Sequence, residues 1–290
     1  MKPLFKTLLL LALTPAVLHA DTDRDDNDNR NDDRDGKNRQ GLKVVGLTSD
    51  QRLVCFFENS PERTFKLGTV SGLIGGDTAL VGIDYRVQDG QLYGVGNAGG
   101  VYILNTGNAA ATLVNRLTVA LTGTSFGVDF NPVADRLRIF GDDGQNLRHN
   151  INVGGVTLVD GPLNYIAGTP ITGVTGAAYT NNDLDPLTAT TLYDIDSTLD
   201  QVVLQSPPNN GSLAATGKLT VDTTSSVGFD IFSTVRNGVT VRVQALASLT
   251  AANGFISLYS ISLPTGKATL QGTFRNWDKV VDIAIPLDQR

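Results

Sequence analysis

Four aspartates recur at one position of a short repeated string, and together they could bind a cation. Each string reads Gly-x-Asp-x or a close variant of it. Four carboxylates that face a common axis would repel one another unless a cation or nearby arginines neutralise them. Carboxylate oxygens are ligands that Ca²⁺ prefers, so one interpretation is a calcium-type site. The interpretation we prefer is that each acid bonds backbone amides or an arginine of its own repeat. The four candidate metal ligands are Asp84, Asp129, Asp230 and Asp282.

A second group of polar residues lies between residues 127 and 150. Asp129 and Asn131 would share one face of a strand, and two arginines would share a face of the next strand. Arginine forks suit carboxylate and phosphate groups, so this group could bind an anion or an acidic substrate. The alternative, which we prefer, is a buried polar network that fixes the packing of neighbouring repeats. With amides from a later Asn- and Pro-rich loop, the candidate ligand-binding residues are Asn131, Arg136, Arg138, Asn146, Arg148, Asn181 and Asn182.

Two further motifs and the single cysteine indicate no catalytic site. Residues 94–99 match a dinucleotide-binding fingerprint, but a strand follows them where that fingerprint needs a helix. Ser125 lies in a Gly-x-Ser-x-Gly string with Asp142 and His149 downstream, yet the string leads into a strand and not into a strand-to-helix turn. Cys55 stands in an apolar run, where a thiol is inert. We therefore predict no catalytic residue.

Composition and charge are those of a folded, exported protein. The 290 residues are 41% hydrophobic and carry a net charge of -6, which is enough apolar material for one large domain and no basic footprint for nucleic acid. Residues 1–20 combine two lysines, an apolar run, Pro15 and Ala20, the pattern of a signal peptide cleaved near Ala20. The apolar run is too short for a membrane span. We expect a secreted or periplasmic monomer without a nucleic-acid partner.

Residues 21–40 have a composition of their own. They contain eight Asp, four Arg, one Lys and no apolar residue. Such a segment cannot bury surface to offset its ordering entropy, so we predict a disordered, Asp-rich tether. Part of it matches the start of a calcium loop, but the twelfth position, which needs a bidentate Glu, is Leu42. We prefer a solvated linker with at most weak cation binding.

The repeated strings define the architecture. Their spacings are 45, 49, 52 and 52 residues when the string at residues 176–179 is counted as a degenerate copy. This is the length of a four-stranded propeller blade. Within each repeat, short β-branched runs alternate with Asp-Gly, Asn-Gly and Gly-Gly turns, which is typical of hairpins. We predict an all-β, five-bladed β-propeller over residues 41–290, in which the C-terminal strand at residues 280–285 completes the first blade.

The same strings resemble the secreted bacterial domain-of-unknown-function 4394 family. The resemblance covers nearly all of residues 43–285, with Val87 standing where the family often has a proline. It implies a propeller-like, exported protein, and it carries over no activity, cofactor or catalytic residue. The strings that carry it are residues 82–86 with 92–94, 129–132 with 135–138, 145–148, 178–182, 192–196 and 205–211.

Two functions from different classes remain. The first, which we prefer, is a non-catalytic binding or scaffold module that presents loops to a small molecule, a polymer or a protein. The second is a metal-dependent hydrolase or lactonase-like enzyme, in which carboxylates around the tunnel hold a metal that activates water. The single histidine of the mature chain favours the first function.

Overall fold

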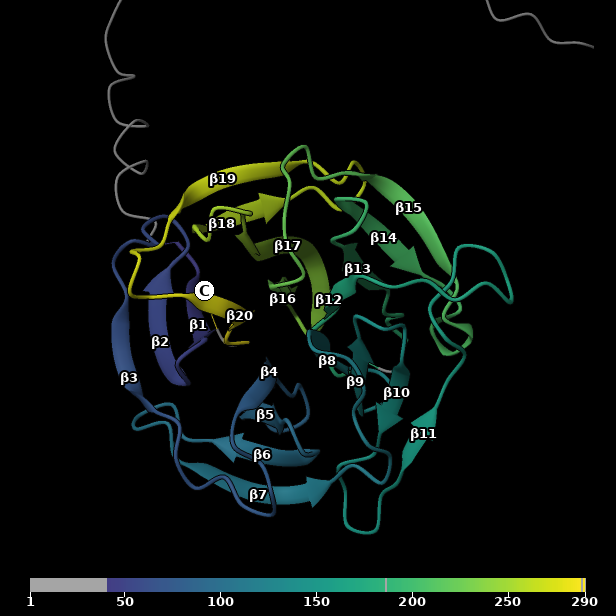
Figure 1. Cartoon of the computed structure of the whole chain (residues 1–290), viewed down its shortest axis with the longest axis horizontal. Coiled ribbons are helices and arrows are strands. Elements are labelled where there is room, and N and C mark those ends of the chain that lie inside the picture. Colours follow the sequence, from purple (N-terminus) through teal and green to yellow (C-terminus); the bar gives the residue numbers. More distant parts are fainter. Residues whose placement is uncertain (1–40, 186, 288, 290) are drawn as a thin grey trace, which may run out of the picture. The chain divides into compact units, whose positions relative to one another are not determined.

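The computed structural model describes residues 41–290, apart from residues 186, 288 and 290. The signal peptide and the tether predicted over residues 1–40 lie outside the described residues. Within the described part, the chain forms five four-stranded antiparallel sheets in a ring around a central axis (Figure 1). This confirms the predicted all-β, five-bladed propeller.

We number the sheets I to V along the chain and give their strands from the axis outward. Sheet I contains β20 (Val280–Ala284), β1 (Lys43–Thr48), β2 (Arg52–Phe57) and β3 (Phe65–Thr69). Sheet II contains β4 (Leu80–Tyr85), β5 (Leu92–Gly96), β6 (Gly100–Leu104) and β7 (Ala111–Arg116). Sheet III contains β8 (Phe126–Asn131), β9 (Arg136–Gly141), β10 (Asn146–His149) and β11 (Thr157–Val159). Sheet IV contains β12 (Val174–Tyr179), β13 (Leu192–Asp196), β14 (Gln201–Gln205) and β15 (Leu213–Lys218), and sheet V contains β16 (Val227–Arg236), β17 (Val239–Thr250), β18 (Ile256–Ile261) and β19 (Ala268–Thr273).

The termini of the domain meet in sheet I. β20 pairs antiparallel with β1, so that Ile283 lies opposite Gly46 and Ala284 opposite Val45. The last strand of the chain is therefore hydrogen-bonded to the first described strand. No helix among the residues described is long and apolar enough to cross a membrane, and the helical structure in this part is a 3₁₀ turn at Pro208–Asn210.

The core lies between neighbouring sheets. Apolar side chains from adjacent sheets form one cluster at each contact, as where Leu47 and Leu53 of sheet I pack with Leu80 and Ile83 of sheet II. The innermost strands are buried on both faces, and every residue of β12 is buried. Such strands read as continuous apolar runs, which explains why the repeated strings were recognisable in the sequence.

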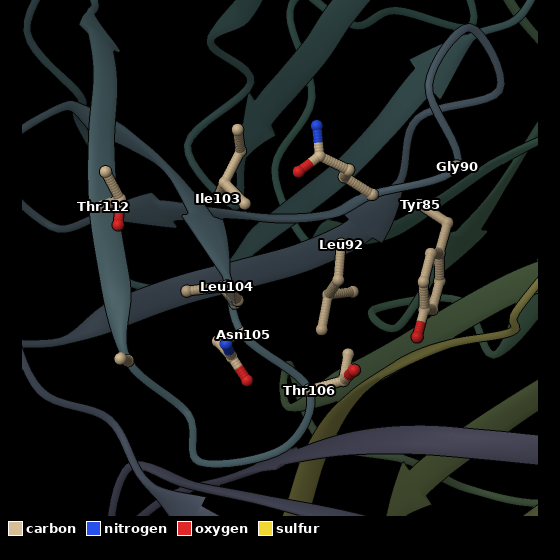
Figure 2. A pocket seen from close by; sticks show the side chains of 10 residues that line it. Tyr85, Gly90, Leu92, Ile103, Leu104, Asn105, Thr106 and Thr112 are labelled. Atoms are coloured by element: carbon tan, nitrogen blue, oxygen red, sulfur yellow. The ribbon is translucent and has the colours of Figure 1, made fainter.

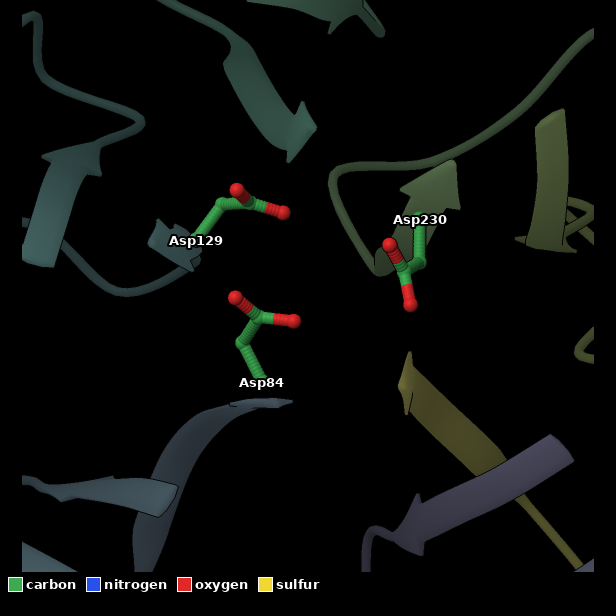
Figure 3. A group of neighbouring side chains, drawn as sticks. All are labelled: Asp84, Asp129 and Asp230. Carbon is green, nitrogen blue, oxygen red and sulfur yellow. The ribbon is translucent and has the colours of Figure 1, made fainter. Parts of the chain in front are cut away.

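The innermost strands approach one another very closely, and glycine makes this approach sterically possible. A Cβ atom at Gly228 would lie 2.5 Å from the Cα atom of Asp282, and one at Gly82 would lie 2.4 Å from a methyl group of Val128. The recurring glycine of the string is therefore a packing requirement. The residue two positions later is often Asp, and three of these Asp side chains converge (Figure 3).

Candidate functional site

Three of the four predicted metal ligands meet on the axis. Asp84, Asp129 and Asp230 each offer a carboxylate oxygen, and these oxygens all lie within 4.8 Å of one another. The three side chains come from β4, β8 and β16 and converge on a common point (Figure 3). All three residues are buried, at 4 to 7% exposure. We call this set the axial carboxylates.

Each axial carboxylate also joins its own sheet to the next one. The Asp84 carboxylate accepts hydrogen bonds from the backbone N–H of Tyr85 and, in sheet III, of Phe130, both at 2.7 Å. Asp129 accepts one from Tyr179 N–H in sheet IV at 3.2 Å. Asp230 likewise bonds the N–H of Ile231 in its own strand and of Ile285 after β20, both at 2.5 Å. The acids therefore hold neighbouring inner strands together.

Asp282 lies in a different layer of the ring. Asp84 and Asp129 each accept a hydrogen bond from the next sheet, and the donor is the residue that directly follows the position equivalent to the acid. Asp230 accepts the corresponding bond from Ile285 N–H, so the equivalent position in β20 is the preceding residue, Ala284. Asp282 is two residues earlier, level with the repeated glycines. Its carboxylate accepts hydrogen bonds from Ile83 N–H at 2.7 Å and Ile283 N–H at 2.9 Å. The prediction of four equivalent acids in a ring is therefore wrong for Asp282, and three equivalent acids remain. In β12 and β20 the equivalent positions are occupied by Ala178 and Ala284.

Burial gives the axial carboxylates a strong preference for the neutral form. Burial raises the pKa of Asp84 well above its ordinary value, and the neighbouring acids raise it further. The pKa of Asp129 is raised by burial and then by Asp84. Burial raises the pKa of Asp230 to about 7 against the opposing effect of its two backbone hydrogen bonds. At neutral pH the group must therefore hold protons or a compensating cation.

The space beside these carboxylates is small. A cavity of about 10 Å³ is lined by the three acids together with Tyr179 and Asn182, among other residues. Such a volume corresponds to about one water-sized sphere. A single ion or water fits there, whereas a substrate does not.

Arg138 is the centre of the second predicted group, and it is fully engaged within the protein. Its guanidinium donates to Asn146 Oδ1 at 2.7 Å, to Asp160 Oδ2 at 2.6 Å and to Asn209 Oδ1 at 3.0 Å. It also donates to the Tyr179 hydroxyl at 3.3 Å. The side chains of Arg138 and Asp160 are only 2% and 5% exposed. The contacts join sheet III to sheet IV, which is the arrangement of a buried polar network.

Arg148 completes this network from the outer side. It binds both carboxylate oxygens of Asp160, at 2.6 and 2.9 Å, and this contact raises the pKa of the Arg148 guanidinium. Asp160 thus forms ion pairs with two arginines. It escaped sequence analysis because it lies in an ordinary turn after β11, outside any repeated string.

One buried acid near this network has no hydrogen bond within the described part of the chain. Both carboxylate oxygens of Asp194, a residue with 0% exposure, lack a partner there, as does the Gln205 side-chain oxygen. Burial raises the pKa of Asp194 well above its ordinary value, although the charge of Arg138 opposes this. The raised pKa favours the protonated form of Asp194, whereas Asp160 is the described carboxylate that forms ion pairs with Arg138 and Arg148.

Of the remaining predicted ligand-binding residues, Asn131 reaches this network through a side-chain hydrogen bond with Tyr179, and the others lie elsewhere. The Arg136 guanidinium bonds the carbonyl oxygens of Ala134 and Asp135 in its own turn. Asn131 caps the same turn. Asn181 donates its backbone N–H to Ser233 Oγ at 3.0 Å. Asn182 lines the axial cavity. The seven candidates are thus distributed over several places, with Arg138, Asn146 and Arg148 together in one of them.

Ser125, Asp142 and His149 do not form a triad. The Ser125 hydroxyl donates to Ser225 Oγ at 3.1 Å, and Asp142 accepts from the backbone and hydroxyl of Thr124. His149 is fully buried, with Nδ1 at 3.0 Å from Thr157 Oγ1, and burial lowers its pKa to about 4. Within the described part of the chain, no hydrogen bond connects any two of these three side chains.

A hollow of a size suited to a small molecule lies on sheet II. This cavity of about 440 Å³, which we call the sheet II groove, is within the usual range of ligand sites. In Figure 2, Leu104 and Leu92 lie between Thr112 on one side and Tyr85 on the other. No lysine, arginine, aspartate or glutamate lines it. Its residues are Tyr85, Gly90, Gln91, Leu92, Ile103, Leu104, Asn105, Thr106, Ala110 and Thr112.

The sheet II groove combines an apolar floor with polar side chains at its rim. Leu92 and Leu104 are buried at 1% and 3% exposure. Gln91, Thr106 and Thr112 are exposed, and no described residue forms a hydrogen bond with their side chains. Sequence analysis missed the groove because its residues belong to turns and strand ends of ordinary composition.

Comparison with known proteins gives a family and several distant structures. A family model described as a domain of unknown function, DUF4394, matches residues 52–284. No protein with a curated description matches the chain. An auxiliary nutrient binding protein from Bacteroides ovatus is 13% identical, with 60% of this chain and 46% of that chain covered and a TM-score of 0.39. A second, from Bacteroides thetaiotaomicron, is 11% identical, with 81% and 59% covered and a TM-score of 0.45.

A putative 6-phosphogluconolactonase from Bacteroides fragilis is also similar, at 11% identity, with 81% of this chain and 82% of that chain covered and a TM-score of 0.38. The chain spans only about half the length of the two nutrient binding proteins. At these TM-scores, none of the three structures assigns a ligand or an activity to this chain.

Proposed function

The chain belongs to the domain-of-unknown-function 4394 family, and from this premise we propose that it is a non-catalytic binding module. Its ligand occupies the sheet II groove and is a neutral, hydroxyl-bearing small molecule such as a saccharide. The observation that carries this proposal is the lining of the groove, where the side chains of Gln91, Thr106 and Thr112 have no hydrogen bond with a described residue and surround an apolar floor. A ligand with both hydroxyl groups and apolar C–H faces matches these groups, and the uncharged lining favours a neutral one.

A groove-filling substitution tests this proposal. Thr112→Trp places a large side chain on an exposed strand position at the groove, so we expect the dissociation constant of a neutral saccharide to rise at least tenfold with the melting temperature unchanged. Isothermal titration calorimetry with a panel of neutral mono- and oligosaccharides measures this. Val114→Trp is the matched control, because Val114 is an exposed residue of the same strand outside the groove. Absence of binding by the whole panel, or equal binding by both variants, contradicts the proposal.

For the axial carboxylates we propose a structural cation. Three acids surround a cavity with room for about one ion, and each carboxylate oxygen that accepts an N–H retains a second lone pair. Oxygen ligands of this kind, with the Asn182 amide nearby, suit calcium. The same small volume argues against the metal-dependent hydrolase considered above, because a substrate has no room to reach the ion.

Removal of metal ions tests the axial cation. After treatment with a chelator at pH 8, the protein is expected to melt several degrees lower, and added calcium is expected to restore the melting temperature. Differential scanning calorimetry with elemental analysis measures both effects. Asp129→Asn should abolish the response to calcium. A metal-free protein whose melting temperature ignores both chelator and calcium would instead support a protonated group of acids.

Export is the third part of the proposal, and it rests on the sequence of residues 1–20. Their charged start, apolar run and terminal Ala20 match a signal peptide. Mass spectrometry of the protein recovered from the periplasm or the medium should give a mature chain that starts at Asp21. Recovery of the full-length chain from the cytoplasm alone would contradict export.

A further inference from the structure

The hairpin of β16 and β17 extends well beyond the rest of its sheet. These strands have 10 and 12 residues, whereas the other strands have three to six. β18 pairs with β17 only from Ala245 to Thr250, and the hairpin continues to a turn at Asn237 and Gly238, both with positive φ. Residues 233–244 therefore form a two-stranded projection. It lies on the side of the ring reached by the part of β16 that follows Asp230. We call this segment the sheet V hairpin.

Contacts with two neighbouring sheets hold the projection in place. The Asp183 carboxylate accepts hydrogen bonds from the Thr240 backbone N–H at 3.0 Å and from the Thr240 hydroxyl at 2.7 Å. On the other side, the Gln244 amide donates to the Glu58 carboxylate of sheet I. A projection fixed in this way presents its surface without a large ordering cost on binding.

The surface of the sheet V hairpin is apolar and basic. Four valines are 38 to 56% exposed, an unusual density for a short segment. Arg236 and Arg242 lie on one face, because Arg242 pairs with Thr234 and Arg236 is two residues further along the same strand. Neither arginine forms a salt bridge with a described carboxylate. The exposed valines are Val235, Val239, Val241 and Val243.

One edge of the hairpin also lacks a neighbouring strand. Pairing between β17 and β18 stops at Ala245, so residues 241–244 have no strand beside them on that edge. Unpaired backbone groups of an exposed edge are a template for an added strand. Only a polypeptide supplies the complementary main-chain groups, which favours a peptide partner over an anionic lipid surface.

We propose that the sheet V hairpin is a docking surface for an acidic, extended polypeptide segment of a partner protein. The segment adds beside residues 241–244, with its acidic side chains toward Arg236 and Arg242 and its apolar side chains toward Val235 and Val243, which lie on the opposite face. This surface is separate from the sheet II groove. The tests of peptide docking and of ligand binding in the groove therefore have independent outcomes.

Binding of designed peptides tests the docking surface. With the full chain, a fluorescein-labelled octapeptide of alternating Glu and Val is expected to bind at least tenfold more tightly than the matching Lys and Val peptide, by fluorescence polarisation. The double substitution Arg236→Glu with Arg242→Glu should reverse this preference. Arg63→Glu with Lys66→Glu, at exposed positions in the turn before β3 and in β3, makes the same change in net charge and should leave the preference intact. Melting temperatures check that each variant is folded.

Two further results would overturn the proposal. An acidic peptide N-methylated along one edge cannot add as a strand on that edge, so binding unchanged by methylation of either edge would exclude strand addition. Failure of both peptides to bind, or binding of phosphatidylserine vesicles in place of the acidic peptide, would also exclude a polypeptide partner of this chemistry.

Discussion

Arg138→Ala is expected to destabilise the propeller by about 3–5 kcal/mol, the usual cost of removing one partner from a buried ion pair. The substitution removes every hydrogen bond of the guanidinium to Asp160, Asn146 and Asn209 at once. It also leaves the Asp160 carboxylate, at 5% exposure, with Arg148 as its remaining ion-pair partner. For a domain of this size, the melting temperature should fall on the order of 10 °C. Thermal and urea unfolding followed by circular dichroism measures the change.

Arg136→Ala is the control for this substitution. Arg136 lies two residues away in the same strand, and its guanidinium bonds only carbonyl oxygens of its own turn. Its replacement should cost less than about 1 kcal/mol. If Arg138→Ala melted like the wild type, the buried network would not join the two sheets, and an anion-binding role for Arg138 would regain support.

Asp230→Asn is expected to change how stability depends on pH. In the metal-free native state the pKa of Asp230 is about 7, above its value in the unfolded chain. The native state therefore binds the proton more tightly, and the stability that this provides is present below pH 4 and is lost as pH rises toward 7. A pKa raised from about 4 to about 7 corresponds to about 4 kcal/mol. The variant lacks this loss, so its stability relative to wild type should improve by several kcal/mol between pH 4 and pH 8.

The stability of Asp230→Asn must be compared with that of wild type at each pH, because the titration of His149 changes stability with pH in the opposite direction. Burial lowers the pKa of His149 to about 4, so its contribution to stability is lost as pH falls below about 6.5. This contribution is common to wild type and variant, and it cancels in their difference. Asp222→Asn, at an exposed position, is the control and should show no pH-dependent difference. Urea unfolding in chelator at each pH provides the free energies. A constant difference between wild type and Asp230→Asn would contradict the raised pKa.

The architecture was predictable because the innermost strands are buried on both faces and need glycine at a close contact. Those two requirements produce a recurring string, and its spacing gives the number of blades. The same method failed in detail at β20. There the string Val-Val-Asp-Ile resembles the others, but the backbone bonds align Asp282 with the glycines and Ala284 with the aspartates. A two-residue shift keeps every side chain on the same face, so alternation alone could not detect it.

The polar network and the groove were predictable to different degrees. Arginines in a repeated strand environment indicated a network, and Arg138, Asn146 and Arg148 do belong to one. Asp160 was not predicted because its role depends on a turn that folds back against β9 and β10. The sheet II groove was not predictable because it results from the relative positions of four strands and two turns, and its individual residues carry no distinctive pattern.

Hydrogen exchange of the full chain shows whether a neutral ligand binds in the sheet II groove. Backbone amide exchange would be followed by mass spectrometry with and without a neutral saccharide mixture at millimolar concentration. We expect slower exchange in residues 90–92 and 103–112, which contain most of the residues that line the groove, and little change around Arg138 or the axial carboxylates. Unchanged exchange throughout, or protection confined to the axis or to the network between sheets III and IV, would contradict this expectation.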